Sequence, residues 1–256
     1  MSNGTHTFQP TVLIVSLDGF RPNYIDRGLT PNLHQLSETG VAPEYMKPCF
    51  PSVTFPNHYS IVTGLYPESH GVIANEYYDP VLDQQFDIGS GATSLQSYWW
   101  EGTSGGLVEP IWVTAEKQGV ITATHMWPGS EAVIQGIEPT HVDKFNAAED
   151  LSNKVHRVMG WLDLPDEERP GFIATYVPTI DSVGHHDGPD SLALNISLTD
   201  VDSMIGAIMD GLEQRNLTDI VNLIVVVRSI YRQFSHISLI TAWLKLPEIE
   251  SSILMK

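Results

Sequence analysis

Short apolar runs rich in β-branched residues, at 12–17, 120–125, 171–177 and 221–227, are the feature that most constrains the fold of this chain. Such runs are typical of strands that are buried on both faces. Helix-like segments separate them along the sequence. Because strands that alternate with helices form doubly wound sheets, the sequence predicts an α/β fold: a mostly parallel sheet with helices on both faces.

The expected helices follow start and stop signals. One begins at Thr30-Pro31 and ends at Gly40, and another spans 57–63 and ends at Gly64. Further helices are predicted at 111–118, at 147–161 and around 201–212, where apolar residues recur at helical spacing. Residues 79–110, rich in Gly, Ser, Asp and aromatics, lack clear periodicity and are predicted to form a long irregular surface insertion over the site.

Composition excludes several classes of function. A net charge of −18 argues against unaided binding to nucleic-acid polymers or anionic membranes, since both require basic patches. Cys49 is the only cysteine, so a metal would have to be held by His and carboxylate side chains. We also expect no membrane segment in this chain, because no apolar run approaches the roughly 20 residues that a membrane span needs.

The cellular compartment is indicated only weakly. Asn-x-Ser/Thr sequons occur at Asn3, Asn195 and Asn216, and sequons are glycosylated in secreted proteins. The chain opens with no signal-like apolar region. We therefore expect a parent protein that is secreted or faces the extracellular or lumenal side of a membrane, with its targeting segment outside this chain.

Thr54 is the first candidate for chemistry. It stands among prolines immediately before the helix expected at 57–63, where unpaired backbone N–H groups and the helix dipole favour an anion such as phosphate. A threonine hydroxyl is a poor nucleophile at neutral pH, so it needs a base or a metal ion to help it lose its proton.

Two further groups follow predicted strands. Asp18 ends the first strand, and Asp181 and His185 lie on a glycine-punctuated turn after the strand at 171–177. Ligands bind at the carboxyl edge of open α/β sheets, and a carboxylate with an imidazole can hold zinc. The alternatives are a turn aspartate before Gly19 and a solvated loop histidine.

Several motifs occur in the order and spacing of one known family. They are Leu17-Asp18-Gly19-Phe20-Arg21, Pro51-Ser52-Val53-Thr54-Phe55-Pro56-Asn57-His58, Tyr66-Pro67-Glu68-Ser69-His70-Gly71, Asn75 and Asp181-Ser182-Val183-Gly184-His185. They resemble the nucleotide pyrophosphatase/phosphodiesterase family, the type I phosphodiesterases of the alkaline phosphatase superfamily. The resemblance runs from about residue 10 to about residue 226. It implies an alkaline-phosphatase-like sheet and zinc-dependent hydrolysis of phosphodiester or pyrophosphate bonds in nucleotides or related esters.

The resemblance also implies roles for single residues. Thr54 would be the nucleophile; Asp18 and Thr54 would contact one zinc ion, and Asp181 and His185 a second. Two adjacent cations would lower the pKa of the nucleophile and neutralise charge on the attacking and leaving oxygens.

Three residues would contact the substrate. By the same resemblance, Asn75 would donate to a non-bridging phosphate oxygen. Phe55 and Tyr176 match positions at which the family stacks a nucleotide base, and the alternative is that both are packing aromatics.

The resemblance stops after Val226. The family continues into a Ser-Asp-His-Gly-Met motif that completes the first zinc site, and a later histidine completes the second, whereas this chain continues Val227-Arg228-Ser229. His236, the only histidine of the tail, has different surroundings. We therefore expect residues 1–227 to be a partial catalytic domain and residues 228–256 a non-matching tail, as in a truncated or alternatively spliced form or a mis-read gene model.

This departure predicts a sheet that is incomplete at the C-terminus and zinc sites that lack two ligands and one ligand, respectively. Zinc sites normally use at least three protein ligands, so we expect impaired turnover. Two alternatives stay open: a catalytically inactive isoform or pseudoenzyme, and another phosphohydrolase of the same superfamily. The letters G-x-S-x-G occur once, at 102–106, inside the segment predicted to be irregular rather than between a strand and a helix, so no nucleophile elbow is predicted, and no phosphate-binding P-loop motif is present. The expected partner is a small nucleotide or phosphodiester, and the sequence leaves the oligomeric state open.

Overall fold

The centre of the molecule is a six-stranded sheet in the order β5-β4-β6-β1-β7-β8. The computed structural model describes residues 1–43, 46–102, 108–228 and 239–242. Strands β1, β4, β5, β6 and β7 are parallel, and β8 pairs antiparallel with β7. The predicted mostly parallel α/β sheet is therefore confirmed. The strands are β1 (Thr11–Asp18), β4 (Thr122–His125), β5 (His141–Asp143), β6 (Phe172–Val177), β7 (Val221–Arg228) and β8 (Leu239–Ala242).

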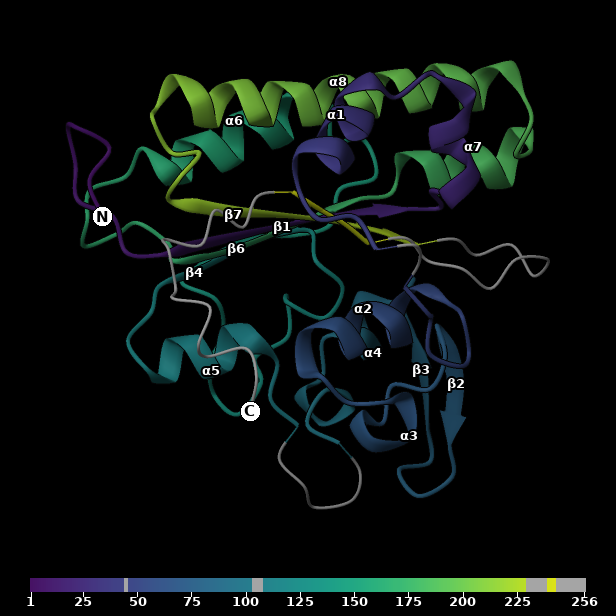
Figure 1. The fold of residues 1–256 in the computed structure, drawn as a ribbon. Helices are drawn as coiled ribbons and strands as arrows, with labels where there is room; N and C mark the ends of the chain where they lie inside the picture. The colour runs from purple at the N-terminus through teal and green to yellow at the C-terminus, as the bar shows by residue number, and fades with distance from the viewer. Residues whose placement is uncertain (44–45, 103–107, 229–238, 243–256) are drawn as a thin grey trace, which may run out of the picture.

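Helices cover both faces of this sheet, as predicted (Figure 1). One layer holds α1 (Pro31–Thr39), α6 (Leu151–Leu162), α7 (Thr179–Asp187) and α8 (Leu192–Gln214). The opposite layer holds α2 (Thr54–Thr63), α3 (Pro67–His70), α4 (Gly91–Ser94), α5 (Ile111–Lys117) and a hairpin of β2 (Glu76–Asp79) and β3 (Gln84–Asp87). Short 3-10 turns occupy Pro22–Arg27 and Ser97–Trp99.

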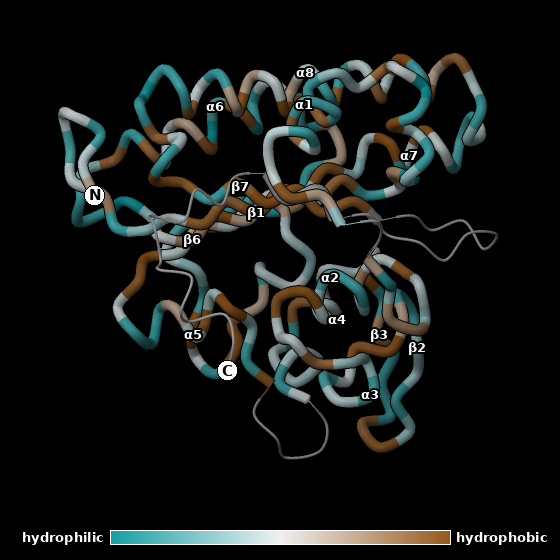
Figure 2. The backbone as a smooth tube through the Cα atoms, in the orientation of Figure 1, coloured by the Kyte–Doolittle hydropathy of each residue, from teal (hydrophilic) through white to brown (hydrophobic). Residues whose placement is uncertain are grey.

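Strand β1 separates two hydrophobic cores. Leu13 and Val15 pack in the core under α6 and α8, whereas Ile14 packs in the core that contains Tyr59 and Trp100. Successive side chains of a strand point to opposite faces, so a strand between two cores must be apolar along its whole length. Figure 2 shows the central strands as the hydrophobic layer between the two sets of helices. Burying each large aliphatic side chain stabilises the fold by about 1.5–3 kcal/mol.

Helix α8 is longer than predicted, since it begins at Leu192 rather than near Val201. The side chain of Ser191 caps it by accepting a hydrogen bond from the backbone N–H of Leu194 at 3.1 Å. By length and composition, α8 is the one helix among the described residues that could cross a membrane. Half of its most apolar window is buried in the fold, as expected of a core helix that packs against α1, α6 and α7.

The prediction of an irregular insertion at 79–110 is wrong in part. The segment contains β3, α4 and one of the 3-10 turns, and Trp99 and Trp100 are only 2% and 1% exposed. Both indoles pack edge-on against Phe86, with ring centroids 5.3 and 5.9 Å apart. Such an aromatic cluster is held by tertiary contacts, which leave no periodic pattern in the sequence.

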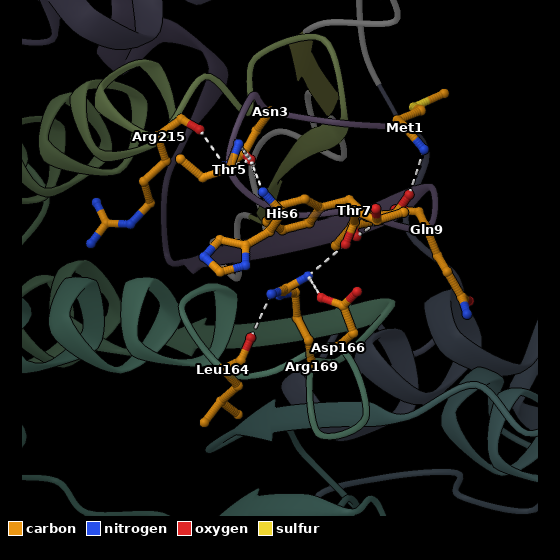
Figure 3. A network of polar contacts seen from close by, with 12 residues as sticks. Met1, Asn3, Thr5, His6, Thr7, Gln9, Leu164, Asp166, Arg169 and Arg215 are labelled. Carbon is orange, nitrogen blue, oxygen red and sulfur yellow. Dashed lines mark hydrogen bonds and ion pairs between the residues drawn. The ribbon is translucent and has the colours of Figure 1, made fainter.

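The N-terminal segment is fastened at the amino ends of the strands (Figure 3). Arg169, just before β6, donates to the carbonyl of Thr7 at 2.8 Å and lies over the Phe8 ring. Asn3 donates through its amide to the carbonyl of Arg215 at 2.9 Å. This network ties the start of β1 to the start of β6 and to the end of α8, on the sheet edge opposite the predicted site.

Candidate active site

A pocket of about 700 Å³ lies at the carboxyl ends of β4 and β6. This is the sheet edge at which ligands bind in open α/β folds. Six of the seven candidate residues are in or beside it: Thr54, Phe55, Asn75, Tyr176, Asp181 and His185 line the pocket. Asp18, the seventh, is fully buried and bonded to one of the lining residues. Residues far apart in the chain therefore meet at one place, at the sheet edge where the positions of Asp18, Asp181 and His185 after strands predicted a site.

Thr54 is the first residue of α2, with Val53 in an extended conformation as its N-cap. The helix therefore begins three residues earlier than predicted, and Thr54 belongs to its first turn. It ends where predicted, at Gly64, whose φ of 68° is left-handed and favours glycine. The first-turn N–H groups of a helix have no partner within it, so α2 presents Thr54 where an anion is favoured.

His58 fixes α2 against the sheet. Its Nδ1 lies 2.8 Å from the carbonyl of Thr54, and its Nε2 lies 2.8 Å from Oγ of Ser16. Because a carbonyl only accepts, Nδ1 carries the proton and Nε2 accepts from the serine. The histidine is fully buried, so this link between β1 and the first turn of α2 sets the position of Thr54. His58 lies within the motif at 51–58, but its place in the sequence predicted no role for it.

Asp18 and Asp181 come together through a glycine. Gly19 has a φ of 74°, and a Cβ at this position would lie 2.4 Å from Cα of Asp181. Only glycine allows this approach, because it tolerates the left-handed conformation and has no side chain. The Asp18-Gly19 pair therefore lets the start of α7 pack against the end of β1.

Tyr176 holds the carboxylate of Asp18. Its hydroxyl donates to Oδ2 at 2.7 Å, while the backbone N–H of Gly19 donates to Oδ1 at 3.0 Å. The Tyr176 ring is 7% exposed and contacts His58 edge-on, with centroids 5.1 Å apart. One edge of this tyrosine therefore faces the pocket, while its hydroxyl is bonded to a second candidate residue.

Asn75 and Phe55 lie next to the nucleophile candidate. Oδ1 of Asn75 accepts from the backbone N–H of Phe55 at 3.0 Å, and within the described residues no bond engages its Nδ2. The amide therefore has a donor for a ligand in the pocket. The Phe55 ring packs near Phe86 and Trp100 and is half-buried.

Asp181 and His185 lie on a helix, which corrects the predicted turn. Helix α7 runs through both, so their i, i+4 spacing puts them on one face. Their Oδ1 and Nε2 atoms are 3.7 Å apart. Two ligands of one tetrahedral zinc ion lie roughly 3.3–3.5 Å from each other, given the usual bond lengths. The pair therefore has nearly the spacing that one cation needs.

The donor set suits a cation only in part. Over residues 1–43, 46–102, 108–228 and 239–242, no group of three or more His, Cys, Asp or Glu side chains gathers in a way that could hold a metal ion. A zinc site takes at least three protein ligands. Each predicted position thus has two donors from this part of the chain. His236, whose surroundings differ from those of the family's last zinc ligand, lies outside the described residues.

The aromatic wall of the pocket was predicted only in part. Trp100, Trp127 and Phe145 line the pocket together with Phe55, and Phe145 is 53% exposed. Trp100 belongs to the segment 79–110 that was expected over the site, whereas Trp127 and Phe145 were missed. Phe145 is anchored through its backbone N–H, which donates to Glu131 at 2.7 Å. None of these residues belongs to a quoted motif, so only the fold could bring them together.

His70 and Asn57 brace the loop and helix that carry Thr54. Asn57 donates through its amide to the carbonyls of Pro51 and Val53, and its Oδ1 accepts from the backbone N–H of Cys49. His70 is fully buried and its Nδ1 accepts from the backbone N–H of Val72. Burial lowers the pKa of His70 to about 4, so it is neutral at pH 7.

The fold and the pocket define an α/β protein with an alkaline-phosphatase-like sheet and with hydroxyl, amide, carboxylate and imidazole groups around one cavity. The chain belongs to the type I phosphodiesterase/nucleotide pyrophosphatase family, whose model matches residues 12–227. The family resemblance and the fold that it implied are therefore confirmed.

Curated relatives agree with this assignment. The chain is 48% identical over 223 residues to an uncharacterized pyrophosphatase/phosphodiesterase of Schizosaccharomyces pombe, covering 87% of this chain and 45% of that protein. It is 43% identical to human ectonucleotide pyrophosphatase/phosphodiesterase family member 1, covering 85% of this chain and 23% of that protein. A venom phosphodiesterase of Macrovipera lebetinus is 42% identical, with 85% and 25% covered. The chain thus spans less than half the length of these relatives.

Solved structures also match. Murine ectonucleotide pyrophosphatase/phosphodiesterase 5, in an inactive form in complex with AMP, has a TM-score of 0.78 and 32% identity. The match covers 86% of this chain and 57% of that one. The human counterpart has a TM-score of 0.77 at 32% identity, covering 85% and 56%.

Proposed function

We propose that this chain carries a site for hydrolysis of phosphodiester or pyrophosphate bonds in nucleotides or related esters, with Thr54 as the nucleophile. The observation that carries the proposal is the position of Thr54: it starts α2 and lines the same pocket as Asn75, Asp181 and His185. A helix start favours a phosphate, and a hydroxyl there can attack the phosphorus atom. The solved murine relative adds support, because its inactive form has a threonine replaced by alanine and binds AMP.

The chain's own residues have distinct parts in this reaction. The Thr54 oxygen forms a bond to phosphorus while the bond to the leaving oxygen breaks, and water then releases the phosphoryl or nucleotidyl group from Thr54. The amide of Asn75 donates to a non-bridging oxygen, which gains charge in the transition state. His58 and Ser16 keep Thr54 in place through the buried link to β1.

Aromatic side chains are proposed to contact the nucleotide base. We assign Phe55 and Phe145 to contact a nucleotide base, since both line the pocket and are accessible. Tyr176 also lines the pocket, but its hydroxyl is bonded to Asp18. We therefore assign its main part to the orientation of that carboxylate, with its exposed edge as a substrate contact.

Divalent cations, with zinc as the expected metal, belong to this proposal. Asp18 and Thr54 are assigned to one ion, and Asp181 and His185 to the other. A bound cation supplies the acidity that a threonine hydroxyl lacks and neutralises phosphate charge. Because the described residues offer two donors to each ion, we expect weak binding and slow turnover by this chain.

A second candidate function is nucleotide binding without turnover. The two-donor sets favour it, since a pocket can hold a nucleotide by its aromatic and amide groups while lacking tightly bound metal. Metal content distinguishes the two functions: about two zinc ions per chain would favour the hydrolase, and none would favour the binding protein.

The experiment that tests the hydrolase is release of p-nitrophenol from a p-nitrophenyl nucleotide ester, with and without added zinc. Zinc-dependent release that disappears in Thr54→Ala would support the proposal. Equal release by wild type and Thr54→Ala would reject Thr54 as the nucleophile.

We also propose an extracellular or lumenal location, because the relatives include ectonucleotide and venom enzymes. Of the three sequons, we favour Asn216 as the glycan acceptor, because it is exposed in the loop after α8, whereas Asn3 and Asn195 are half-buried. The Asn216 amide donates only a long hydrogen bond of 3.4 Å, to the Asn3 carbonyl, while the Asn3 amide donates to Arg215 at 2.9 Å. Expression in a secretory host should give a glycosidase-sensitive mass shift that Asn216→Gln removes.

A further inference from the structure

A buried lysine lies behind the pocket wall, and the proposed chemistry does not use it. Lys154, on α6, is 1% exposed. Its Nζ is 3.2 Å from the carbonyl of Tyr176, 3.3 Å from Nε2 of His125 and 3.0 Å from Sδ of Met126. None of these three partners is a carboxylate. Lysine is rarely buried without an ion-pair partner, because taking an ammonium group out of water is costly.

The neighbours of Lys154 are arranged to accept its protons. Nδ1 of His125 lies 2.9 Å from Oδ2 of Asp143, which as a carboxylate only accepts, so Nδ1 carries the proton. Nε2 of His125 therefore presents its lone pair to the lysine. The Tyr176 carbonyl accepts, and the thioether of Met126 accepts weakly. The three N–H donors of the ammonium group thus have three acceptors. On the solvent side, Nε of Arg157 pairs with Oδ2 of Asp143 at a distance of 2.7 Å.

These contacts join two strand ends at the pocket. Met126 follows β4, and Tyr176 is close to the end of β6. Both line the pocket. Met126 has a φ of 62°, which is uncommon outside glycine and persists only where the surroundings hold it. Tyr176 in turn bonds to Asp18. A single ammonium group therefore contacts two residues of the pocket wall, and one of them, Tyr176, is hydrogen-bonded to the candidate residue Asp18.

We propose that Lys154 is a positioning residue that holds Met126 and Tyr176 in the pocket wall and so preorganises the site for a nucleotide. The proposal rests on the proposed function, since it concerns the same pocket. Burying the Lys154 ammonium group costs free energy of folding. Such a cost is expected next to a pocket where the function of the site, rather than stability, requires the group. Burial lowers the pKa of Lys154 to about 8, so the ammonium form prevails at pH 7.

The test compares Lys154→Met, Lys154→Arg and the matched control Lys117→Met. Methionine keeps much of the length of lysine and removes its charge and donors. Lys117 lies on α5, pairs with Glu109 and does not line the pocket. AMP affinity is measured by calorimetry at pH 7, at a temperature where circular dichroism shows every variant fully folded. Loss of charge-assisted hydrogen bonds predicts a Kd about tenfold higher, or more, for Lys154→Met.

Lys117→Met should bind AMP as the wild type does, and Lys154→Arg should recover part of the affinity. A folded Lys154→Met protein with wild-type Kd would overturn the proposal, because a merely structural lysine affects melting and not binding. If the wild type itself binds no AMP, the proposed function fails separately. In that case the methyl order parameter of Met126, measured by NMR at pH 7, tests the positioning role of Lys154. A lower order parameter in Lys154→Met than in the wild type supports this role, and an unchanged value rejects it.

Discussion

The hydroxyl of Tyr176 donates to Oδ2 of Asp18 across 2.7 Å, so a residue near the end of β6 orients a carboxylate at the end of β1. Both groups are buried, and 158 positions separate them in the chain. The orientation of the predicted metal ligand therefore depends on the pairing of β1 with β6, in which Ser16 is opposite Tyr176. Tyr176, which is predicted to contact substrate, therefore also orients a predicted metal ligand.

Tyr176→Phe is expected to weaken the site while keeping the fold. The substitution removes one hydrogen bond to a buried carboxylate, worth about 1.5–3 kcal/mol, and leaves the aromatic ring in place. We expect kcat/KM for a p-nitrophenyl nucleotide ester to fall about tenfold or more. Tyr98→Phe is the control, because its hydroxyl bonds to Gln84 away from the pocket. Equal activity of the two variants would contradict the role given to the Tyr176 hydroxyl.

Gly19→Ala is expected to destabilise the protein more than Gly28→Ala. Both glycines have left-handed φ values, 74° and 69°, so both substitutions carry the same kind of backbone strain. Only at Gly19 would the new Cβ meet the backbone of Asp181, at 2.4 Å, whereas nothing lies within 4 Å at Gly28. Urea unfolding of the two variants isolates the cost of separating α7 from β1. Equal free energies of unfolding for Gly19→Ala and Gly28→Ala would show that the backbone at residue 19 does not pack closely against Asp181.

Zinc is expected to bind through His185 and not through its neighbour. The His185 imidazole lies 3.7 Å from Asp181, whereas the side chain of His186 is 86% exposed and lies beside Asp187. Zinc that binds only the folded protein raises its melting temperature, by roughly 2–4 °C per kcal/mol for a domain of this size. We expect His185→Ala to lower this rise, because it removes a ligand of one of the two proposed ions, and His186→Ala to retain the full rise. The same rise in both variants would place zinc elsewhere.

Thr54→Ala is expected to abolish hydrolysis but to retain AMP binding. The loss should be on the order of 10⁴-fold or more in kcat, as when a nucleophile is removed from other enzymes. Ser52→Ala, which removes a hydroxyl from the same loop, is the control and should remain active. Residual turnover in Thr54→Ala at the level of the control would identify a different nucleophile.

The free energy of unfolding is expected to rise between about pH 8 and 10.5 because of Lys154. Burial lowers the pKa of Lys154 from 10.5 to about 8 in the folded protein. In this window the unfolded chain binds more protons than the folded one, so stability increases with pH, by at most about 3 kcal/mol. Below pH 8 both states are protonated and the dependence disappears.

Lys154→Met should lack this rise, as measured by urea unfolding from pH 7 to 10. The other charged groups around Lys154, namely His125, Asp143, Glu149 and Arg157, are the same in both proteins. Tyr59 and Tyr77, whose pKa values burial raises, are also common to both, so the difference between the two profiles isolates the lysine. Parallel profiles would mean that Lys154 does not titrate in this range.

The sequence alone determined the fold class and the family of this protein. Buried strands such as β1 need apolar residues on both faces, and helix ends favour residues such as Gly64. Strands and helix ends can therefore be predicted from the local sequence. Asp18 and Asp181 follow predicted strands and Thr54 precedes a predicted helix, which is why the sequence placed all of them at one sheet edge, and the order and spacing of their motifs identified the family.

Only the tertiary structure decided what each side chain touches. The bond of Tyr176 to Asp18, the link from His58 to Ser16 and the contacts of Lys154 join residues that are distant in sequence, and hydrogen bonding of this kind leaves no periodic signal. The pocket residues Trp127 and Phe145 were missed for the same reason. Packing and burial depend on which strands and helices become neighbours, and that is a property of the folded chain as a whole.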